Sequence, residues 1–239
     1  MSEQMTFKRY EIKYLITKPQ MAVIQNAISE HMIADSHGQN TLCSLYFDTP
    51  DYLLVRRSLE HPVYKEKLRL RSYGIADNKH TVFVELKKKY HSVVYKRRAA
   101  MSAAQAYDYL LKGKPAMDSQ IIREIDYFLQ IYQGIRPAVL LTYKRDAYYG
   151  KDDHEFRITF DDHLLWRDYD LNLESGIYGE PLLNPNYILM EVKVAEAFPL
   201  WFVRLLSENH IYKTHFSKYG AAYTAIYQNQ QKGGVFRYA

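Results

Sequence analysis

The sequence has almost no cysteine and no long apolar run. Cys43 is the single cysteine of the 239 residues, which excludes an internal disulfide and is typical of a protein from a reducing compartment. Histidine and cysteine show no ligand spacing, so nothing indicates a structural zinc site. No apolar stretch approaches the roughly 18 residues that cross a bilayer. We therefore expect a soluble, cytoplasmic protein.

The sequence also lacks a large excess of charge of one sign. Its 32 Lys and Arg residues stand against 27 Asp and Glu residues, which leaves a net charge of +5. Any binding of anions must therefore come from clustered cations. The composition, 47% hydrophobic and 25% charged, is that of a globular protein with ample material for a core. We see no linker or internal repeat and expect one domain over residues 1–239.

One stretch carries cations in strict alternation with apolar residues. Lys65, Lys67, Arg69, Arg71 and Tyr73 fall on one face of a strand, and Leu68 and Leu70 fall on the other. If the Leu face packs against helices, the cations point either into bulk water or into the interior of a closed sheet. The neighbouring segments must decide between these two interpretations.

The same mixed alternation recurs along the chain. Predicted strands cover Phe7–Ile16, Leu42–Phe47, Lys65–Tyr73, Thr81–Lys89, Val93–Ala99, 138–145, 155–161 and Tyr187–Val194. Predicted helices cover Lys18–Met32, 102–112, 119–132, 199–210 and 217–231, with a short helix or turn over 51–60. The helices need an apolar sheet surface, so they pack most easily outside a sheet whose charged face is turned inward. This pattern predicts an α+β fold with a closed antiparallel β-barrel around a charged tunnel.

Such a tunnel gathers many like charges. The predicted lumen cations are Lys13, Lys67, Arg69, Arg71, Lys87, Arg145, Arg157 and Lys193, with partial compensation from Glu11, Glu85, Glu155 and Glu191. A multiply charged anion makes this clustering tolerable, and phosphate chains fit because Arg offers bidentate contacts and Lys offers point charge. A carboxylate among them can hold a divalent cation that bridges phosphate oxygens. Four neighbouring cations, Lys88, Lys89, Arg97 and Arg98, are interpreted as mostly solvated, with some at a basic rim.

Six motifs carry a resemblance to a known family. They are Arg9-x-Glu11-x-Lys13, Lys67-x-Arg69-x-Arg71, Glu85-x-Lys87, Tyr143-x-Arg145 with Arg157, Glu191-x-Lys193, and Ser217-Lys218-Tyr219. In this order, from Phe7 to Gly220, they resemble the polyphosphate polymerase domain of vacuolar transporter chaperone (VTC) proteins. That family belongs to the triphosphate tunnel metalloenzymes, or CYTH-like superfamily. The resemblance implies a closed barrel of about eight strands that holds triphosphate.

The resemblance implies a metal-dependent phosphotransferase that adds the terminal phosphoryl group of ATP to a growing polyphosphate chain. The implied catalytic residues are Arg69, Arg71, Lys87, Arg145, Arg157 and Lys218, and the implied substrate-binding residues are Lys13, Lys67, Lys96, Tyr143, Lys193 and Ser217. Glu191 is the implied ligand of Mn²⁺ or Mg²⁺, with Glu11 as a second candidate. The expected partners are ATP and inorganic polyphosphate or triphosphate, without nucleic acid.

Two departures bear on this expectation. The hydrolase branch of the superfamily opens with Glu-x-Glu-x-Lys, whereas Arg9 takes the first position here, which favours the polymerase-like branch. Eukaryotic members carry an amino-terminal regulatory domain and membrane helices that this sequence lacks, so we expect export to need a separate membrane protein. Two alternatives stay open: a metal-dependent hydrolase of tripolyphosphate or organic triphosphates, and a non-catalytic polyphosphate-binding protein.

Overall fold

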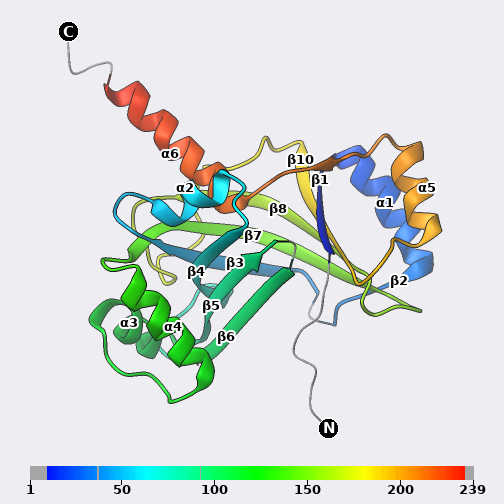
Figure 1. Cartoon of the computed structure of the whole chain (residues 1–239). Helices are drawn as coiled ribbons and strands as arrows, with labels where there is room; N and C mark the ends of the chain where they lie inside the picture. The colour runs from blue at the N-terminus through cyan, green and yellow to red at the C-terminus, as the bar shows by residue number, and fades with distance from the viewer. Residues whose placement is uncertain (1–9, 37, 92, 235–239) are drawn as a thin grey trace.

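A single large sheet forms the centre of the molecule. The computed structural model describes residues 10–36, 38–91 and 93–234. Within these residues eleven strands form one sheet in the order β11-β1-β10-β8-β7-β3-β4-β5-β6, with β2 beside β7 and β9 beside β8. All the pairings are antiparallel. Figure 1 shows the helices grouped at the two sides and at one end of this sheet.

The elements follow the predicted order closely. The strands are β1 (Tyr10–Thr17), β2 (Met32–Ala34), β3 (Asn40–Asp48), β4 (Tyr64–Tyr73), β5 (Thr81–Tyr90), β6 (Val93–Ser102), β7 (Arg136–Gly150), β8 (Arg157–Arg167), β9 (Glu180–Pro181), β10 (Tyr187–Val194) and β11 (Lys213–Thr214). The helices are α1 (Lys18–His31), α2 (Leu53–Leu59), α3 (Ala103–Lys112), α4 (Gln120–Ile131), α5 (Leu200–Glu208) and α6 (Lys218–Gly234). The first residues of the predicted strand Phe7–Ile16 lie outside the described residues.

Local signals place the helix starts. Thr17 and Gln20 form a capping box at α1, and Ser102 and Gln105 form another at α3. In each, the hydroxyl accepts from the third backbone N–H while the Gln side chain accepts from the cap N–H. Ser119 caps α4 by accepting from the N–H of Ile122. These three predicted helix starts are confirmed.

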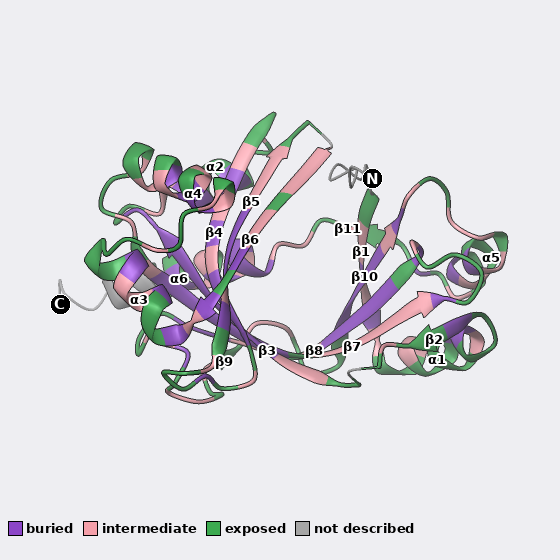
Figure 2. Ribbon diagram, turned by 90° about the horizontal axis from the view of Figure 1, so that it is seen from below, coloured by how far each residue is buried: buried purple, intermediate pink, exposed green. Residues whose placement is uncertain are grey.

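The prediction of a closed barrel is wrong. The sheet curls into a trough, and Figure 2 shows β4, β5 and β6 on one side separated from β1 and β10 on the other. Closure would need β6 to pair with β1 or β11, and no pairing in the described residues joins them. An ion pair spans the gap between the two sides of the trough instead: Lys87 Nζ of β5 lies 3.5 Å from Glu11 Oε2 of β1. The cations that both walls turn inward repel one another and occupy the space between the edges, so they oppose backbone closure.

The outer face of the sheet carries the core, as predicted. Leu68 and Leu70 of β4 are fully buried in a cluster that contains residues of α3 and α4, among them Leu110 and Phe128. A second cluster joins α1 and α5 to β1, β8 and β10 through residues such as Ile24 and Phe202. The helices therefore hold the sheet from outside and leave its charged face to the trough.

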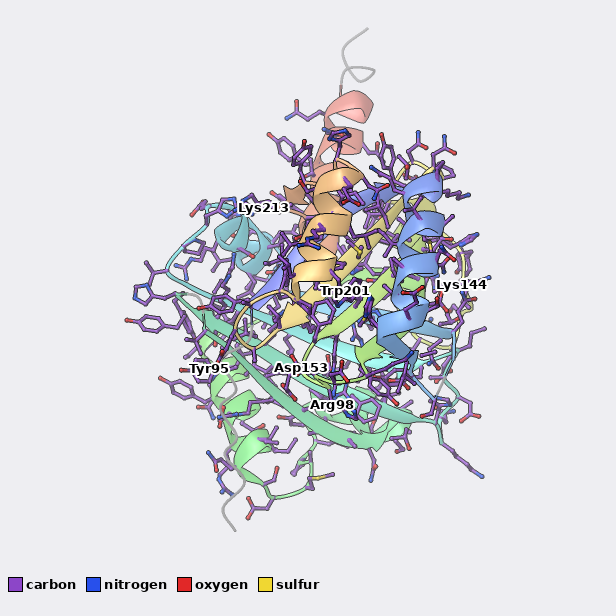
Figure 3. All side chains as sticks on the ribbon, turned by 90° about the vertical axis from the view of Figure 1, so that its right-hand side faces the viewer. Tyr95, Arg98, Lys144, Asp153, Trp201 and Lys213 are labelled. Atoms are coloured by element: carbon purple, nitrogen blue, oxygen red, sulfur yellow. The ribbon has the colours of Figure 1, made fainter. Side chains whose placement is uncertain are left out.

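The two tryptophans pack within the protein. Trp166 is 4% exposed in a cluster with Tyr46 and Tyr219. Trp201, labelled in Figure 3, lies on α5 and stacks on His31 of α1 with ring centroids 4.3 Å apart. Within the described residues, no helix is long and apolar enough to cross a membrane.

Candidate functional site

One wall of the trough is a ladder of cations set by strand register. Across β3, β4, β5 and β6, one row reads Tyr46, Arg69, Glu85 and Arg98. The next row reads Lys67, Lys87 and Lys96, three lysines directly opposite one another. Like charges in facing positions destabilise a sheet by themselves. The rows therefore concentrate charge in a way that stability alone does not explain.

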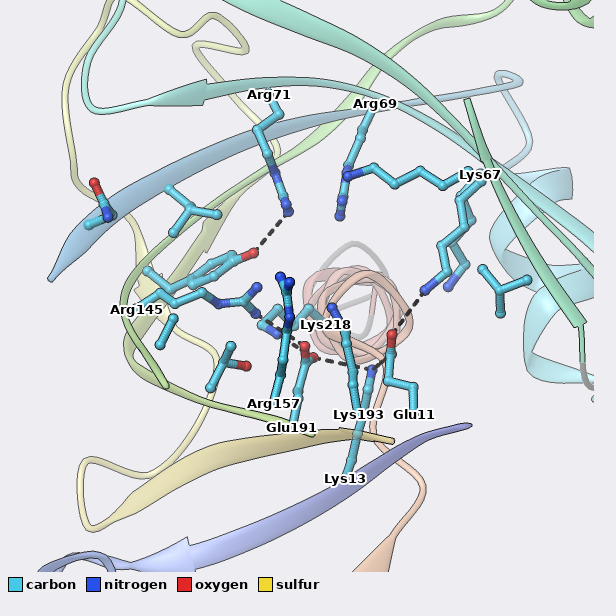
Figure 4. Close-up of a pocket in the computed structure, with 18 of the residues that line it drawn as sticks. Glu11, Lys13, Lys67, Arg69, Arg71, Arg145, Arg157, Glu191, Lys193 and Lys218 are labelled. Carbon is cyan, nitrogen blue, oxygen red and sulfur yellow. Dashed lines mark hydrogen bonds and ion pairs between the residues drawn. The ribbon is translucent and has the colours of Figure 1, made fainter. Parts of the chain in front are cut away.

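The opposite wall carries a matching set of rows. Across β7, β8, β10 and β1, the outermost row reads Tyr149, Arg157, Lys193 and Glu11. The row below it reads Ala147, Thr159, Glu191 and Lys13, and below that Arg145 faces Asp161. Figure 4 shows Arg69, Arg71 and Lys67 on one side pointing toward Arg157, Lys193 and Lys13 on the other.

The walls enclose a cavity of about 880 Å³. Its lining contains all fourteen site residues that the sequence predicts: Glu11, Lys13, Lys67, Arg69, Arg71, Lys87, Lys96, Tyr143, Arg145, Arg157, Glu191, Lys193, Ser217 and Lys218. Eleven lining side chains are Lys or Arg, against the three carboxylates of Glu11, Asp35 and Glu191. This surplus exceeds the net charge of +5 of the whole chain. The excess positive charge of the protein is thus gathered in one cavity.

Glu85 fixes three of these cations. Its carboxylate is 1% exposed and accepts from Arg69 Nε at 2.8 Å, Arg98 Nε at 2.7 Å and Lys96 Nζ at 2.9 Å. Burial alone would raise the pKa of Glu85, but Arg69, Arg71 and Lys96 hold it well below its usual value. Because the carboxylate stays ionised, the guanidinium groups are held in fixed orientations before any ligand arrives.

Arg71 is held differently, by neutral groups. It is 5% exposed, and its Nε donates to Ser44 Oγ at 3.1 Å while its Nη2 donates to Tyr143 Oη at 2.9 Å. Neither partner cancels the positive charge. A buried guanidinium in this setting attracts an anion strongly, and its planar fork matches a phosphate group.

A second network lies at the base of the opposite wall. Asp161 is fully buried and accepts from Arg145 Nη2 at 2.6 Å and from Lys218 Nζ. Glu191 accepts from Lys218 Nζ at 2.9 Å and from Arg145 Nη2 at 3.1 Å. Burial opposes ionisation, but Lys218, Lys13 and Arg145 outweigh it and hold the pKa of Glu191 well below its usual range. Two carboxylates thus orient one arginine and one lysine.

Four consecutive residues close one end of the cavity. The carbonyl of Phe216 accepts from Lys13 Nζ at 3.0 Å, and Ser217 Oγ accepts from Lys67 Nζ at 3.0 Å. Lys218 enters the acidic pair described above, and the ring of Tyr219 stacks on Tyr46 at 4.6 Å. Figure 4 shows α6, which begins at Lys218, end-on behind these side chains. The amino end of α6 therefore joins both walls and adds its positive dipole to the site.

Three groups on the β3 to β6 wall have pKa values displaced toward neutrality. Burial lowers the pKa of Lys67 to about 8, and burial likewise lowers that of Lys96 to about 8. Burial raises the pKa of Tyr46, but Arg69, Arg71 and Lys67 outweigh it and bring the value to about 8. Burial of these charged groups is thus costly here without an anion, as expected of a binding site built for one.

The carboxylates of Glu11 and Glu191 suit a divalent cation. Lys13 Nζ lies 3.6 Å from Glu11 Oε1 and 3.5 Å from Glu191 Oε1, so the two carboxylates flank the ammonium group of Lys13, a position that already suits a cation. Burial would raise the pKa of Glu11, yet Lys87 and other cations lower it to about 2, which keeps the group ionised. No group of three or more His, Cys, Asp or Glu gathers in the described part of the chain. One or two carboxylates with phosphate oxygens are the usual donor set of Mg²⁺, so these residues fit such an ion.

The sequence interpretation missed several contributors. Arg98 lines the cavity, whereas it was expected to be mostly solvated, and its spacing of two residues from Lys96 on β6 is the signal for it. Asp161 takes the compensating role that was assigned to Glu155, because Glu155 lies in the turn before β8. Tyr46 and Ser44 could not be identified from the sequence, since a neutral residue on a strand does not indicate that its side chain contacts an arginine. Arg9, the first position of the leading motif, lies outside the described residues.

Comparison with known proteins gives a family and one curated relative. A family model described as the VTC domain matches residues 8–227. Vacuolar transporter chaperone complex subunit 4 of Schizosaccharomyces pombe is 25% identical over 244 residues, which cover 83% of this chain. The chain spans about a third of the length of that relative, 33%.

Solved structures share the fold. A candidate adenylate cyclase from Bacillus halodurans superposes with a TM-score of 0.56 at 13% identity, over 87% of this chain and 93% of that chain. A candidate adenylyl cyclase from Hippeastrum, described as having a dominant triphosphatase activity, superposes with a TM-score of 0.53 at 15% identity, over 91% of this chain and 96% of that chain. At these identities the likeness concerns the fold alone.

Proposed function

The chain belongs to the VTC domain family, and from that premise we propose that it is a polyphosphate polymerase that uses ATP. The observation that carries the proposal is the cavity of about 880 Å³, in which ten Lys and Arg side chains of the two walls gather with Lys218 of α6. A chain of phosphates is the ligand that this arrangement of charge suits. The relationship to a vacuolar transporter chaperone subunit supports the same substrate class.

The proposed reaction needs little covalent chemistry from the protein. A terminal oxygen of the growing chain attacks the γ-phosphorus of ATP, and the bond from that phosphorus to the β,γ-bridging oxygen breaks, so that ADP leaves with the electron pair. The attacking oxygen is already ionised, so no general base is required. Alignment and stabilisation of the charge on the transferred group suffice.

The residues divide this work by how they are held. Arg69 and Arg98, fixed by Glu85, and Arg71, fixed by Ser44 and Tyr143, present oriented N–H groups to phosphate oxygens. Arg145 on the opposite wall and Lys218 at the start of α6 do the same, fixed by Asp161 and Glu191. The lysine row of Lys67, Lys87 and Lys96 supplies point charge, which suits a repetitive polymer that must move past it.

A divalent cation completes the proposed site. Glu191 and Glu11 would hold Mn²⁺ or Mg²⁺, which when bound neutralises charge on the phosphate oxygens. The name of the Schizosaccharomyces pombe relative places that protein in a complex. A membrane-protein partner for the present chain stays a prediction.

A triphosphate hydrolase is the second candidate. Hydrolysis requires a water to lose a proton, and the phenolate of Tyr46, whose pKa is lowered to about 8, is a base inside the cavity that is able to accept one. Tyr46 Oη lies 3.0 Å from Arg69 Nη1, beside the groups proposed to hold phosphate. The Hippeastrum structure with its triphosphatase activity has the same fold.

One incubation separates the candidates. The purified chain is mixed with ATP and Mn²⁺ or Mg²⁺, long anionic polymer is resolved on a gel, and ADP and free phosphate are assayed. Polymerase activity gives polymer and ADP with little free phosphate. Free phosphate without polymer supports the hydrolase, and retention of labelled polyphosphate without release of ADP supports a non-catalytic binding protein.

A further inference from the structure

One lining tyrosine lies apart from the phosphate network. Tyr149 is half-buried near the end of β7 and pairs with Arg157 of β8 in the outermost row of its wall. It shares the inner face of β7 with Arg145, four residues earlier, which corresponds to about 13 Å along a strand. The ring of Tyr149 thus lines the cavity on the same sheet face as the deepest cations, but farther along β7 toward its end.

The other lining tyrosines are already engaged. The ring of Tyr46 stacks on Tyr219 at 4.6 Å, and the ring of Tyr143 lies 4.8 Å from Lys218 Nζ. Tyr73 packs edge-on against Phe83 at 5.9 Å, and Tyr148 packs against Phe160 at the same separation. Tyr149 contacts the exposed ring of His154 at 5.0 Å in a tilted arrangement. Tyr149 differs in its place, because it lies in the outermost row of its wall, where its ring can receive a planar ligand group at the mouth of the cavity.

Two polar groups accompany this ring. Arg157 is exposed, and its Nε donates to the carbonyl of His154 at 3.1 Å, so the guanidinium is held beside the aromatic pair. Asp35 also lines the cavity, and its backbone N–H donates to the carbonyl of Ala147 at 2.8 Å, next to Tyr149 on the inner face of β7. A carboxylate accepts hydrogen bonds from exocyclic amino groups, whereas it repels phosphate.

We propose that Tyr149, with Asp35 and Arg157, forms the subsite for the nucleobase of the nucleotide substrate. The base stacks on Tyr149, its exocyclic amino group donates to Asp35, and Arg157 contacts the first phosphate. The phosphates then run inward from Arg157 toward Arg145 and Arg71. This subsite rests on the proposed function, because it requires a nucleotide as phosphoryl donor.

The test compares two ligands that differ in the nucleoside. Dissociation constants are measured by calorimetry, at one fixed Mg²⁺ concentration, for a non-hydrolysable ATP analogue and for inorganic tripolyphosphate. The variants are Tyr149→Leu, which removes the ring, and Tyr149→Phe, which keeps it. Tyr127→Leu, at a 63% exposed position on α4, is the matched control. Circular dichroism checks that each variant is folded.

The expected result is selective. Tyr149→Leu raises the dissociation constant of the ATP analogue about tenfold, equal to about 1.4 kcal/mol, and changes that of tripolyphosphate by less than about twofold. Tyr149→Phe and Tyr127→Leu match the parent for both ligands. Equal effects of Tyr149→Leu on both ligands, or on neither, overturn the subsite and leave the polymerase proposal standing. A parent protein that binds tripolyphosphate but not the ATP analogue overturns both proposals.

Discussion

Arg71 and Arg69 lie two residues apart on one strand, yet their surroundings give them different roles. Arg69 is neutralised by Glu85, with Nη2 2.6 Å from Oε2, whereas Arg71 contacts the hydroxyls of Ser44 and Tyr143. An unneutralised buried cation costs stability until an anion arrives. Arg71 is therefore the residue whose charge the ligand uses most directly.

Replacing Arg71 separates function from folding. We expect Arg71→Ala to reduce polymer synthesis by at least 100-fold while the protein stays folded, because Glu85 keeps its ion pairs with Arg69, Arg98 and Lys96. Synthesis is measured from ADP release and gel analysis, and stability from urea denaturation. Lys144→Ala, which removes an exposed cation of β7 next to Arg145, is the control and should leave both quantities unchanged. Undiminished synthesis in Arg71→Ala would remove this residue from the site.

Glu191 offers a test of the metal assignment. Glu191→Gln keeps the shape of the side chain but removes the charge that faces Lys13, Lys218 and Arg145. We expect the Mn²⁺ concentration that gives half-maximal synthesis to rise at least tenfold, because a neutral amide is a weaker ligand for a hard cation. Glu124→Gln, which changes a carboxylate that pairs with Arg97 on the outer surface, serves for comparison. An unchanged metal dependence would assign Glu191 to orienting its cations alone.

At the scale of elements, Asp48 ties two helices to the sheet. Its buried carboxylate accepts from the backbone N–H of Leu54 at 2.9 Å and of Val55 at 3.0 Å, and thereby caps α2. It also accepts from Tyr219 Oη of α6 at 2.7 Å. The position of the α6 end that closes the cavity therefore depends on a residue at the end of β3.

Loss of this tie should weaken both helices together. We expect Asp48→Ala to lower the free energy of unfolding by about 3 kcal/mol or more, since it removes three hydrogen bonds to a buried carboxylate and such bonds contribute about 1.5–3 kcal/mol each. Tyr219→Phe, which removes one of these hydrogen bonds, should cost about 1–2 kcal/mol. Urea denaturation with an unchanged m value measures both. A larger loss of unfolding free energy in Tyr219→Phe than in Asp48→Ala would contradict the view that Asp48 connects α2 and α6 to the sheet.

At the scale of the whole molecule, charge crowding couples stability to pH. Lys67 and Lys96 have folded pKa values of about 8, below the unfolded value of about 10.4. Tyr46, also near 8, lies below its unfolded value of about 10. From pH 8 to about 9 the unfolded chain therefore binds more protons at these three sites, and they contribute stability that rises with pH. Closer to pH 10, buried tyrosines with raised pKa values, such as Tyr109 and Tyr219, contribute the opposite trend.

Ligand binding should show the opposite trend. Protonated lysines attract phosphate, so the affinity for tripolyphosphate should fall as pH rises from 8 to 10. We expect the melting temperature of the free protein to rise from pH 8 to 9 and the increase caused by a fixed tripolyphosphate concentration to shrink. Differential scanning fluorimetry at several pH values measures both. Parallel trends would show that these groups do not lie in the ligand site.

Much of the site could be predicted from the sequence because strand alternation is a local property. The period of two puts Lys67, Arg69 and Arg71 on one face wherever the strand lies, and puts Leu68 and Leu70 on the other. The same rule extends to Arg98, which follows Lys96 by two residues. The capping boxes at Thr17 and Ser102 are local for the same reason, since each uses groups three residues apart.

The sequence by itself determined which side chains are turned inward and that helices cover the outside. Only the tertiary structure decided that the sheet stays open, since closure depends on whether β6 and β1, distant in sequence, meet edge to edge. It also decided the partners: Asp161 rather than Glu155 faces Arg145, and Ser217 reaches Lys67, 150 residues away. Alternation fixes a side chain's face. Curvature, register and the entry of α6 fix what it meets there, and these follow from the packing of the whole chain.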